Sequence, residues 1–294
     1  MSSQKHTLAD GRVVSYQFSR VPSGPVVLLS NSLAAPFRSW DKVASVLENK
    51  GYSVLRYDQP GHGETSAPSD VDTTTFESMA DDVLALVRSL KIAKIHAWIG
   101  VSMGAAKGVV FAAKNPGLVG KLVVCDTISS SPVVAGTTDV FEPRIQKARS
   151  DGSMDAMVEA TLARWFSEDW RNKNPSEVRR MREIMMTTQV DGFVTCCRAL
   201  QSDTFDLSKS APKVGTSVNS ALLVVGELDA NLPEDMKTLQ KQIQRGFDDD
   251  SASSGKGKSV AVNVELKVIK DAGHVSYVDG FDQFCDIVTK YLAS

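Results

Sequence analysis

A serine lies between two glycines in Gly100-Val101-Ser102-Met103-Gly104, where an apolar run gives way to a helical pattern. A serine in such a strand-to-helix turn forms a nucleophile elbow, which is so tight that the serine takes strained backbone angles and side chains at the glycine positions would collide. The turn holds the hydroxyl above the end of a sheet, with the N-terminus of the next helix behind it. The spacing predicts Ser102 as a catalytic nucleophile.

A serine hydroxyl is a poor nucleophile unless a base takes its proton, and the chain has four histidines. His6 lies in the N-terminal tail, and His96 lies within a predicted strand, where a structural role is expected. His62 belongs to a loop that follows a strand, and we expect it to hold that loop by hydrogen bonds. His274 follows the last predicted strand, at the sheet edge where ligands gather. We therefore predict His274 as the base, with His62 as the alternative.

A carboxylate must hold the imidazole in the correct tautomer and stabilise the imidazolium. Asp229 ends a strand in a tight turn and lies between Ser102 and His274 in the chain. The order serine, acid, histidine is that of α/β-hydrolases, so Asp229 is the predicted acid. Asp126, after an earlier strand, is the main alternative, and Glu227 is a second one.

The tetrahedral intermediate of acyl transfer needs two N–H donors. Met103 directly follows the nucleophile and can offer its backbone N–H. In α/β-hydrolases the second donor comes from the loop after an early strand, which here is residues 30–35. Counting back from Trp40, which opens the next helix, we expect this donor to be the N–H of Leu33.

Strand and helix patterns alternate over the first part of the chain, which indicates a mostly parallel sheet flanked by helices, an α/β fold. From about Ser129 only helical patterns follow, at 154–166, 176–188 and 191–200, and strand patterns return at 221–225 and 262–268. We therefore expect an α/β-hydrolase core made of residues 1–129 and 211–294, with residues 130–210 inserted as a helical lid, or cap. The small, polar residues at 248–258 predict a surface loop.

Composition narrows the classes of function. The 294 residues are 42% hydrophobic and 23% charged with a net charge of −2, which gives no electrostatic footprint for nucleic acid. No apolar run is long enough to span a bilayer, and the start lacks the apolar segment of a signal peptide. The cysteines have no metal-site spacing, and we expect them as reduced thiols in a cytoplasmic protein that needs no metal or cofactor. These residues are Cys125, Cys196, Cys197 and Cys285.

Several motifs resemble those of the 3-oxoadipate enol-lactonases, which belong to the α/β-hydrolase superfamily. They are Asn31-Ser32-Leu33 with Trp40-Asp41, Arg56-Tyr57-Asp58 with Gly61-His62-Gly63, the elbow at Ser102, His274-Val275-Ser276, Arg164-Trp165-Phe166, Gly192-Phe193 and Cys196-Cys197-Arg198-Ala199-Leu200. They span residues 25–285. The resemblance implies a serine hydrolase that opens a small lactone or ester through an acyl-enzyme on Ser102.

The resemblance also implies roles in the lid. Trp165 and Phe166 would roof the pocket, and a carboxylated lactone would need a cation, for which Arg164 is the first candidate and Arg144 and Arg38 are alternatives.

The chain also departs from the family pattern. Ala34-Ala35 replaces a frequent Gly-Thr pair, Pro60 an arginine, Ala105 a glycine and Tyr277 an asparagine, while Leu232 stands where threonine often follows the acid. Two other functions therefore stay open: a hydrolase of C–C bonds or secondary-metabolite esters, and a lactone-binding protein with slow turnover. The sequence does not indicate an oligomeric state.

Overall fold

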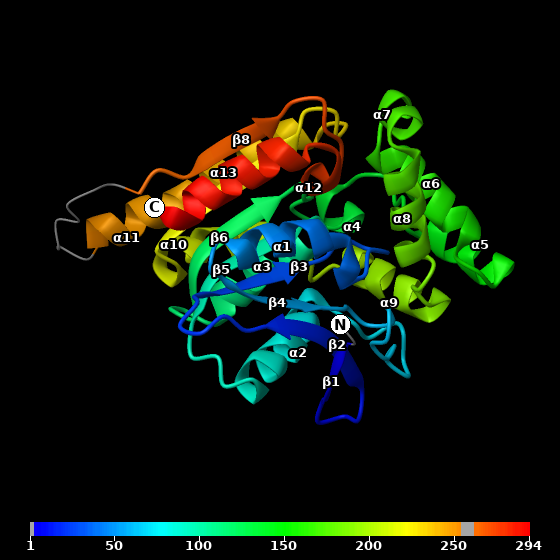
Figure 1. Cartoon of the computed structure of the whole chain (residues 1–294), viewed down its shortest axis with the longest axis horizontal. Coiled ribbons are helices and arrows are strands. Elements are labelled where there is room, and N and C mark those ends of the chain that lie inside the picture. The colour runs from blue at the N-terminus through cyan, green and yellow to red at the C-terminus, as the bar shows by residue number, and fades with distance from the viewer. Residues whose placement is uncertain (1–2, 254–261) are drawn as a thin grey trace.

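The computed structural model describes residues 3–253 and 262–294, and its centre is an eight-stranded sheet (Figure 1). The strands run in the order β1-β2-β4-β3-β5-β6-β7-β8; β1 and β2 are antiparallel to their neighbours, and the pairs from β4 to β8 are parallel. Their bounds are β1 (Gln4–Thr7), β2 (Val13–Ser19), β3 (Val26–Ser30), β4 (Ser53–Tyr57), β5 (Ile95–Val101), β6 (Val119–Cys125), β7 (Ser220–Gly226) and β8 (Glu265–Ile269). The chain therefore has the predicted α/β-hydrolase fold class.

The central strands are mostly apolar and buried, as expected for a parallel sheet with helices on both faces. Val27, Leu28 and Leu29 of β3 are fully buried, as are Leu223 and Val224 of β7. Helices α1 (Asp41–Asn49) and α13 (Phe281–Ala293) contact each other; α3 (Met103–Lys114) contacts α2 (Phe76–Ser89) and α10 (Ala211–Ser217), and α10 packs on α11 (Leu232–Ser253). These contacts form the two helical layers.

The chain between β6 and β7 is helical, and its strand content is a single bridge that pairs Ser130 with Asp206. It contains α4 (Pro132–Ala135), α5 (Glu142–Asp151), α6 (Asp155–Trp165), α7 (Glu168–Lys173), α8 (Pro175–Met185), α9 (Val190–Gln201) and a 3₁₀ turn, η2 (Leu207–Lys209), before α10. Figure 1 shows α5 to α9 grouped beyond the ends of the parallel strands. The remaining short elements are η1 (Phe37–Trp40) and α12 (Ser276–Asp279).

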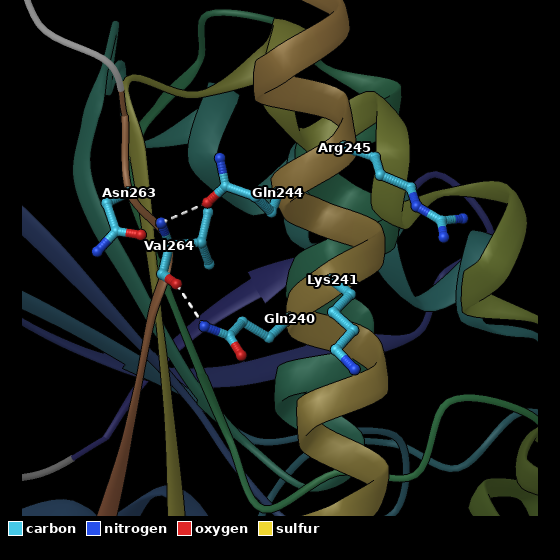
Figure 2. A pocket seen from close by; sticks show the side chains of 6 residues that line it. All are labelled: Gln240, Lys241, Gln244, Arg245, Asn263 and Val264. Atoms are coloured by element: carbon cyan, nitrogen blue, oxygen red, sulfur yellow. Dashed lines mark hydrogen bonds between the residues drawn. The ribbon is translucent and has the colours of Figure 1, made fainter.

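The predicted surface loop at 248–258 is wrong for its first part, because α11 continues through Ser253. Residues 254–258 lie outside the described residues. Figure 2 shows one contact of α11: Gln240 and Gln244 bond the backbone of Val264, with Gln240 Nε2 donating to the carbonyl at 2.6 Å and Gln244 Oε1 accepting from the N–H at 2.8 Å. No described helix is long and apolar enough to cross a bilayer.

Candidate active site

The backbone at Ser102 has the strained geometry of an elbow, with φ 53° and ψ −122°. A Cβ at Gly100 would lie 2.3 Å from the carbonyl oxygen of Gly104, and one at Gly104 would lie 2.3 Å from that of Ser30. Both glycines are therefore required by close backbone approach, and the turn presents Ser102 at the junction of β5 and α3.

The predicted base and acid meet directly. His274 Nδ1 lies 2.7 Å from Asp229 Oδ2, and both side chains are about 95% buried. The carboxylate therefore holds the proton on Nδ1, which leaves Nε2 as the nitrogen that can accept a proton. Burial, and then the positive charge of Arg164, lower the pKa of His274, while Asp229 opposes this shift. The balance of these effects favours the neutral imidazole, the form in which a general base acts.

Topology brings the nucleophile to the same place. β5, β6, β7 and β8 are consecutive and parallel, so their carboxyl ends share one edge of the sheet. Ser102 follows β5, Asp229 follows β7 and His274 follows β8. The N–H of Ser102 donates to the carbonyl of Cys125 at the end of β6, at 2.8 Å, which fixes the elbow against the neighbouring strand.

The alternative acids have other partners. Asp126 is fully buried, and its two oxygens accept from the N–H of Gly226 at 2.7 Å and the hydroxyl of Ser276 at 2.8 Å. These bonds tie the residue after β6 to the end of β7 and to the start of α12. Burial and the charge of Asp229 raise the pKa of Asp126 well above its usual range. Glu227 is exposed and accepts from the N–H of Asp271 at 3.1 Å.

His62 occupies the structural position expected for it. Its Nε2 accepts from the N–H of Ala34 at 2.9 Å, so Nδ1 carries the ring proton and donates to the carbonyl of Pro60, also at 2.9 Å. The ring is fully buried, and burial lowers its pKa to about 4. His62 is therefore a neutral brace for the loop that contains Leu33.

That loop turns sharply at the expected oxyanion donor. The N–H of Ala35 donates to the carbonyl of Ser32 at 3.2 Å, and Ala34 has φ 61°, a conformation that favours glycine. Within the described part of the chain, neither the N–H of Leu33 nor that of Met103 donates a hydrogen bond. Both N–H groups are therefore free to bind an anion.

A cavity of about 80 Å³ lies beside this loop, lined by Leu33, Ala34, Arg144, Met157, Ala160, Thr161, Arg164, Trp165 and Phe193. Four of these residues stand at positions 157, 160, 161 and 164, the spacing of one face of helix α6. This spacing is the signal by which the sequence could have indicated the lining. A larger hollow, of about 940 Å³, contains Arg38. Ser102, Asp229 and His274 line neither of the two, and the smaller cavity is linked to them through Leu33 and through Trp165, which contacts His274.

Two arginines of this cavity have no anionic partner among the described residues. Arg164 and Arg144 make no hydrogen bond or ion pair there, although Arg144 lies 5.6 Å above the ring of Phe141. Surrounding protein, and then the charge of Arg144, lower the pKa of Arg164 to about 10. Arg164 is exposed and also lines the cavity. The pair forms an anion-attracting wall.

Of the two aromatic residues predicted to roof the pocket, Trp165 lies beside His274, whereas Phe166 packs against another residue of the lid segment. Trp165 is buried, its ring centroid lies 6.0 Å from that of His274, and its carbonyl accepts from the N–H of His274 at 3.2 Å. Phe166 stacks on Trp170 with the ring centroids 4.5 Å apart and does not line the cavity. Arg38 is exposed and lies 3.8 Å from Asp41. The part of the chain that the structure describes contains no cluster of three or more metal-ligating side chains.

Comparison with known proteins identifies the family of this fold. The family model described as alpha/beta hydrolase fold matches residues 25–188. The chain is 25% identical to a 3-oxoadipate enol-lactonase of Acinetobacter baylyi, over 98% of this chain and 96% of the relative. A putative carbamate hydrolase of Agrobacterium fabrum is 26% identical over 71% of this chain and 77% of its own. The crystal structure of an enol-lactonase from Burkholderia xenovorans superposes with a TM-score of 0.81 at 29% identity, covering 99% and 100% of the two chains.

Proposed function

The chain belongs to the alpha/beta hydrolase fold family and is a hydrolase of ester bonds, and we propose that it opens a small lactone or ester through an acyl-enzyme on Ser102. The observation that carries this proposal is the 2.7 Å contact between Asp229 and His274 at the sheet edge where the strained elbow presents Ser102.

In the first half-reaction, Ser102 Oγ attacks the acyl carbon and His274 Nε2 takes the hydroxyl proton. Asp229 keeps the imidazole oriented and stabilises the imidazolium. The developing oxyanion accepts from the N–H groups of Leu33 and Met103, and one such donor is worth about 3 kcal/mol of barrier. In an ester the leaving oxygen takes the proton from His274 as the bond breaks, and in an enol-lactone it leaves as an enolate that His274 can then protonate.

In the second half-reaction, His274 removes a proton from water as the water attacks the acyl carbon, and then returns that proton to Ser102 Oγ as the acyl–oxygen bond breaks. A ring-opened lactone remains covalently attached until this step. The protein's own residues account for every proton transfer in the cycle, so the proposal involves no metal or cofactor.

The cavity suggests which lactones fit. A carboxylate that loses its hydration needs a paired cation, and Arg164 and Arg144 stand unpaired in the cavity wall. We propose that the substrate carries a carboxylate bound by Arg164, with Arg144 assisting and Trp165 covering the acyl group. Phe166 would support Trp165 from behind, since the two rings meet edge to face at 6.5 Å.

Residues 130–210 act in this proposal as the lid that closes over the edge of a core formed by 1–129 and 211–294. The site of the reaction is proposed to be the cytoplasm, because the four cysteines are free thiols, as a reducing compartment maintains them.

The decisive experiment compares the wild type with Ser102→Ala on a panel of enol-lactones, saturated lactones and short esters. Turnover should fall by roughly 10⁴-fold or more, because triad members act as a unit. A fluorophosphonate probe should label the parent and not the variant. Labelling at another serine with activity retained would refute the assignment, and one equivalent of product followed by a stall would identify a lactone-binding protein.

Arg164→Ala tests the substrate class. We expect a higher KM for a carboxylated lactone and an unchanged KM for a neutral ester of similar size. An equal rise in KM for both substrates would mean that Arg164 only packs the lid segment. Turnover of neutral esters alone would refute the proposal that the substrate carries a carboxylate.

A further inference from the structure

Lys107 is a buried lysine outside the triad. It lies on α3, is 1% exposed and forms no ion pair among the described residues. Its Nζ donates to Gln59 Oε1 at 3.2 Å and lies 4.8 Å from the ring centroid of Tyr57. Burial lowers the pKa of Lys107 to about 8. A buried ammonium without a carboxylate is costly, so its contacts call for an explanation.

Gln59 connects Lys107 to the loop beside the nucleophile. The glutamine is 1% exposed, and its Nε2 donates to the carbonyl of Ser32 at 2.9 Å. Because a lysine ammonium only donates hydrogen bonds, Lys107 fixes the oxygen of the Gln59 amide toward itself. The amide nitrogen must then face Ser32.

The bond to Ser32 acts on the expected oxyanion donor, because the carbonyl of Ser32 and the N–H of Leu33 belong to one peptide group. A donor on the carbonyl polarises that peptide and strengthens its N–H as a donor. The next peptide is held as well, since the N–H of Ala34 donates to His62. Both peptide groups that flank Leu33 are thus fixed from residues 59–62.

We infer that Gln59, oriented by Lys107, is a positioning residue that aims and polarises the Ser32–Leu33 peptide for the oxyanion. The inference rests on the proposed acyl-enzyme mechanism. This role accounts for the buried hydrogen bonds that run from Lys107 on α3 through Gln59 to Ser32 in the loop after β3.

Gln59→Glu is the sharpest test, because the side chain keeps its shape and an acceptor for Lys107 but loses the donor to Ser32. We expect kcat per active site to fall roughly ten- to a hundredfold with KM nearly unchanged, less than for complete loss of an oxyanion donor because the N–H of Leu33 remains. The endpoint of fluorophosphonate labelling counts the active sites. A trifluoromethyl ketone, which forms an oxyanion on the serine, should lose affinity by the same factor as kcat/KM.

Thr65→Val is the matched control. Thr65 is buried six residues after Gln59, and its hydroxyl accepts from the N–H of Ser15 at 2.8 Å and donates to the carbonyl of Asp58 at 3.1 Å; it makes no hydrogen bond to Ser32. It should lower stability and leave kcat per site unchanged. If Gln59→Glu does not fold, Lys107→Met serves as the second variant. We expect it to lower kcat per site as well, by a smaller factor.

Three results would overturn the inference. The first is unchanged kcat per site in both Gln59→Glu and Lys107→Met, and the second is an equal loss in Thr65→Val. The third is a fall in kcat without any change in ketone affinity. If the wild type itself reacts with neither the ketone nor the fluorophosphonate, the proposed function fails and the inference fails with it.

Discussion

Asp229 and Asp126 are two buried carboxyl groups at the ends of adjacent strands, but only Asp229 contacts His274. We expect Asp229→Asn to lower kcat about 10⁴-fold, since an amide favours the wrong imidazole tautomer. Asp126→Asn should cost less than about tenfold in kcat and should mainly lower stability, because it disturbs bonds to Gly226 and Ser276. Single-turnover rates measure both effects, and the reverse order would place the catalytic acid after β6.

Arg164 also sets the acidity of the base. Its positive charge disfavours the imidazolium and lowers the pKa of His274. Removing that charge in Arg164→Gln should raise this pKa, so the acidic limb of the kcat/KM profile should move to higher pH. The profile is measured with a neutral ester, on which Arg164 makes no ionic contact with substrate. Arg38→Gln, outside the cavity, should leave the limb in place, and an unshifted limb in Arg164→Gln would contradict the electrostatic argument.

At the scale of elements, the turn after β3 carries an alanine where its backbone favours glycine. Ala34 has φ 61°, whereas its neighbour Ala35 has no positive φ, and both methyl groups are fully buried. Replacing either alanine by glycine removes the same apolar contact, but only Ala34→Gly relieves left-handed strain, which is about 1–2 kcal/mol. We expect Ala34→Gly to be more stable than Ala35→Gly by about that amount in urea unfolding. Equal stabilities would mean that Ala34 is unstrained.

Several elements could be predicted from the sequence because their pattern and their burial agree. The alternation of strands and helices expected over the first part of the chain includes β4 and α2, and the strand expected at 221–225 is β7, which extends one residue further at each end. The order serine, acid, histidine predicted Asp229 as the partner of His274, and the two side chains lie 2.7 Å apart; their catalytic roles stay predictions.

Other features required the tertiary structure. The acidic and serine-rich end of α11 suggested a loop, although Met236, Leu239, Ile243 and Phe247 follow helical spacing and are buried. Lys107 would be expected on a solvated face, but α2, α10 and the sheet all contact α3 and leave that lysine no route to solvent. The burial of Lys107 therefore could not be predicted from the sequence of α3 alone, because it depends on elements from other parts of the chain.

At the scale of the whole molecule, the cavity is small for a ligand site. Its volume of about 80 Å³ equals a few water molecules, whereas ligand pockets usually exceed about 300 Å³. We therefore expect kcat/KM to fall at least about tenfold from acetyl to octanoyl esters, because longer chains overpack the space. A p-nitrophenyl ester series measures the trend, and rising activity with chain length would show that the cavity does not limit the acyl group.

The bond between the N–H of His274 and the carbonyl of Trp165 has a consequence for the timing of turnover. Trp165 ends α6, so a displacement of α6 that admits substrate also breaks this bond and releases the backbone of the base. A cycle with such a displacement would separate substrate entry from proton transfer, and α6 would have to return before the chemical steps. We expect kcat to fall as sucrose raises solvent viscosity, with a solvent deuterium isotope effect close to one; a viscosity-independent kcat with a large isotope effect would instead show that proton transfer is the slowest step.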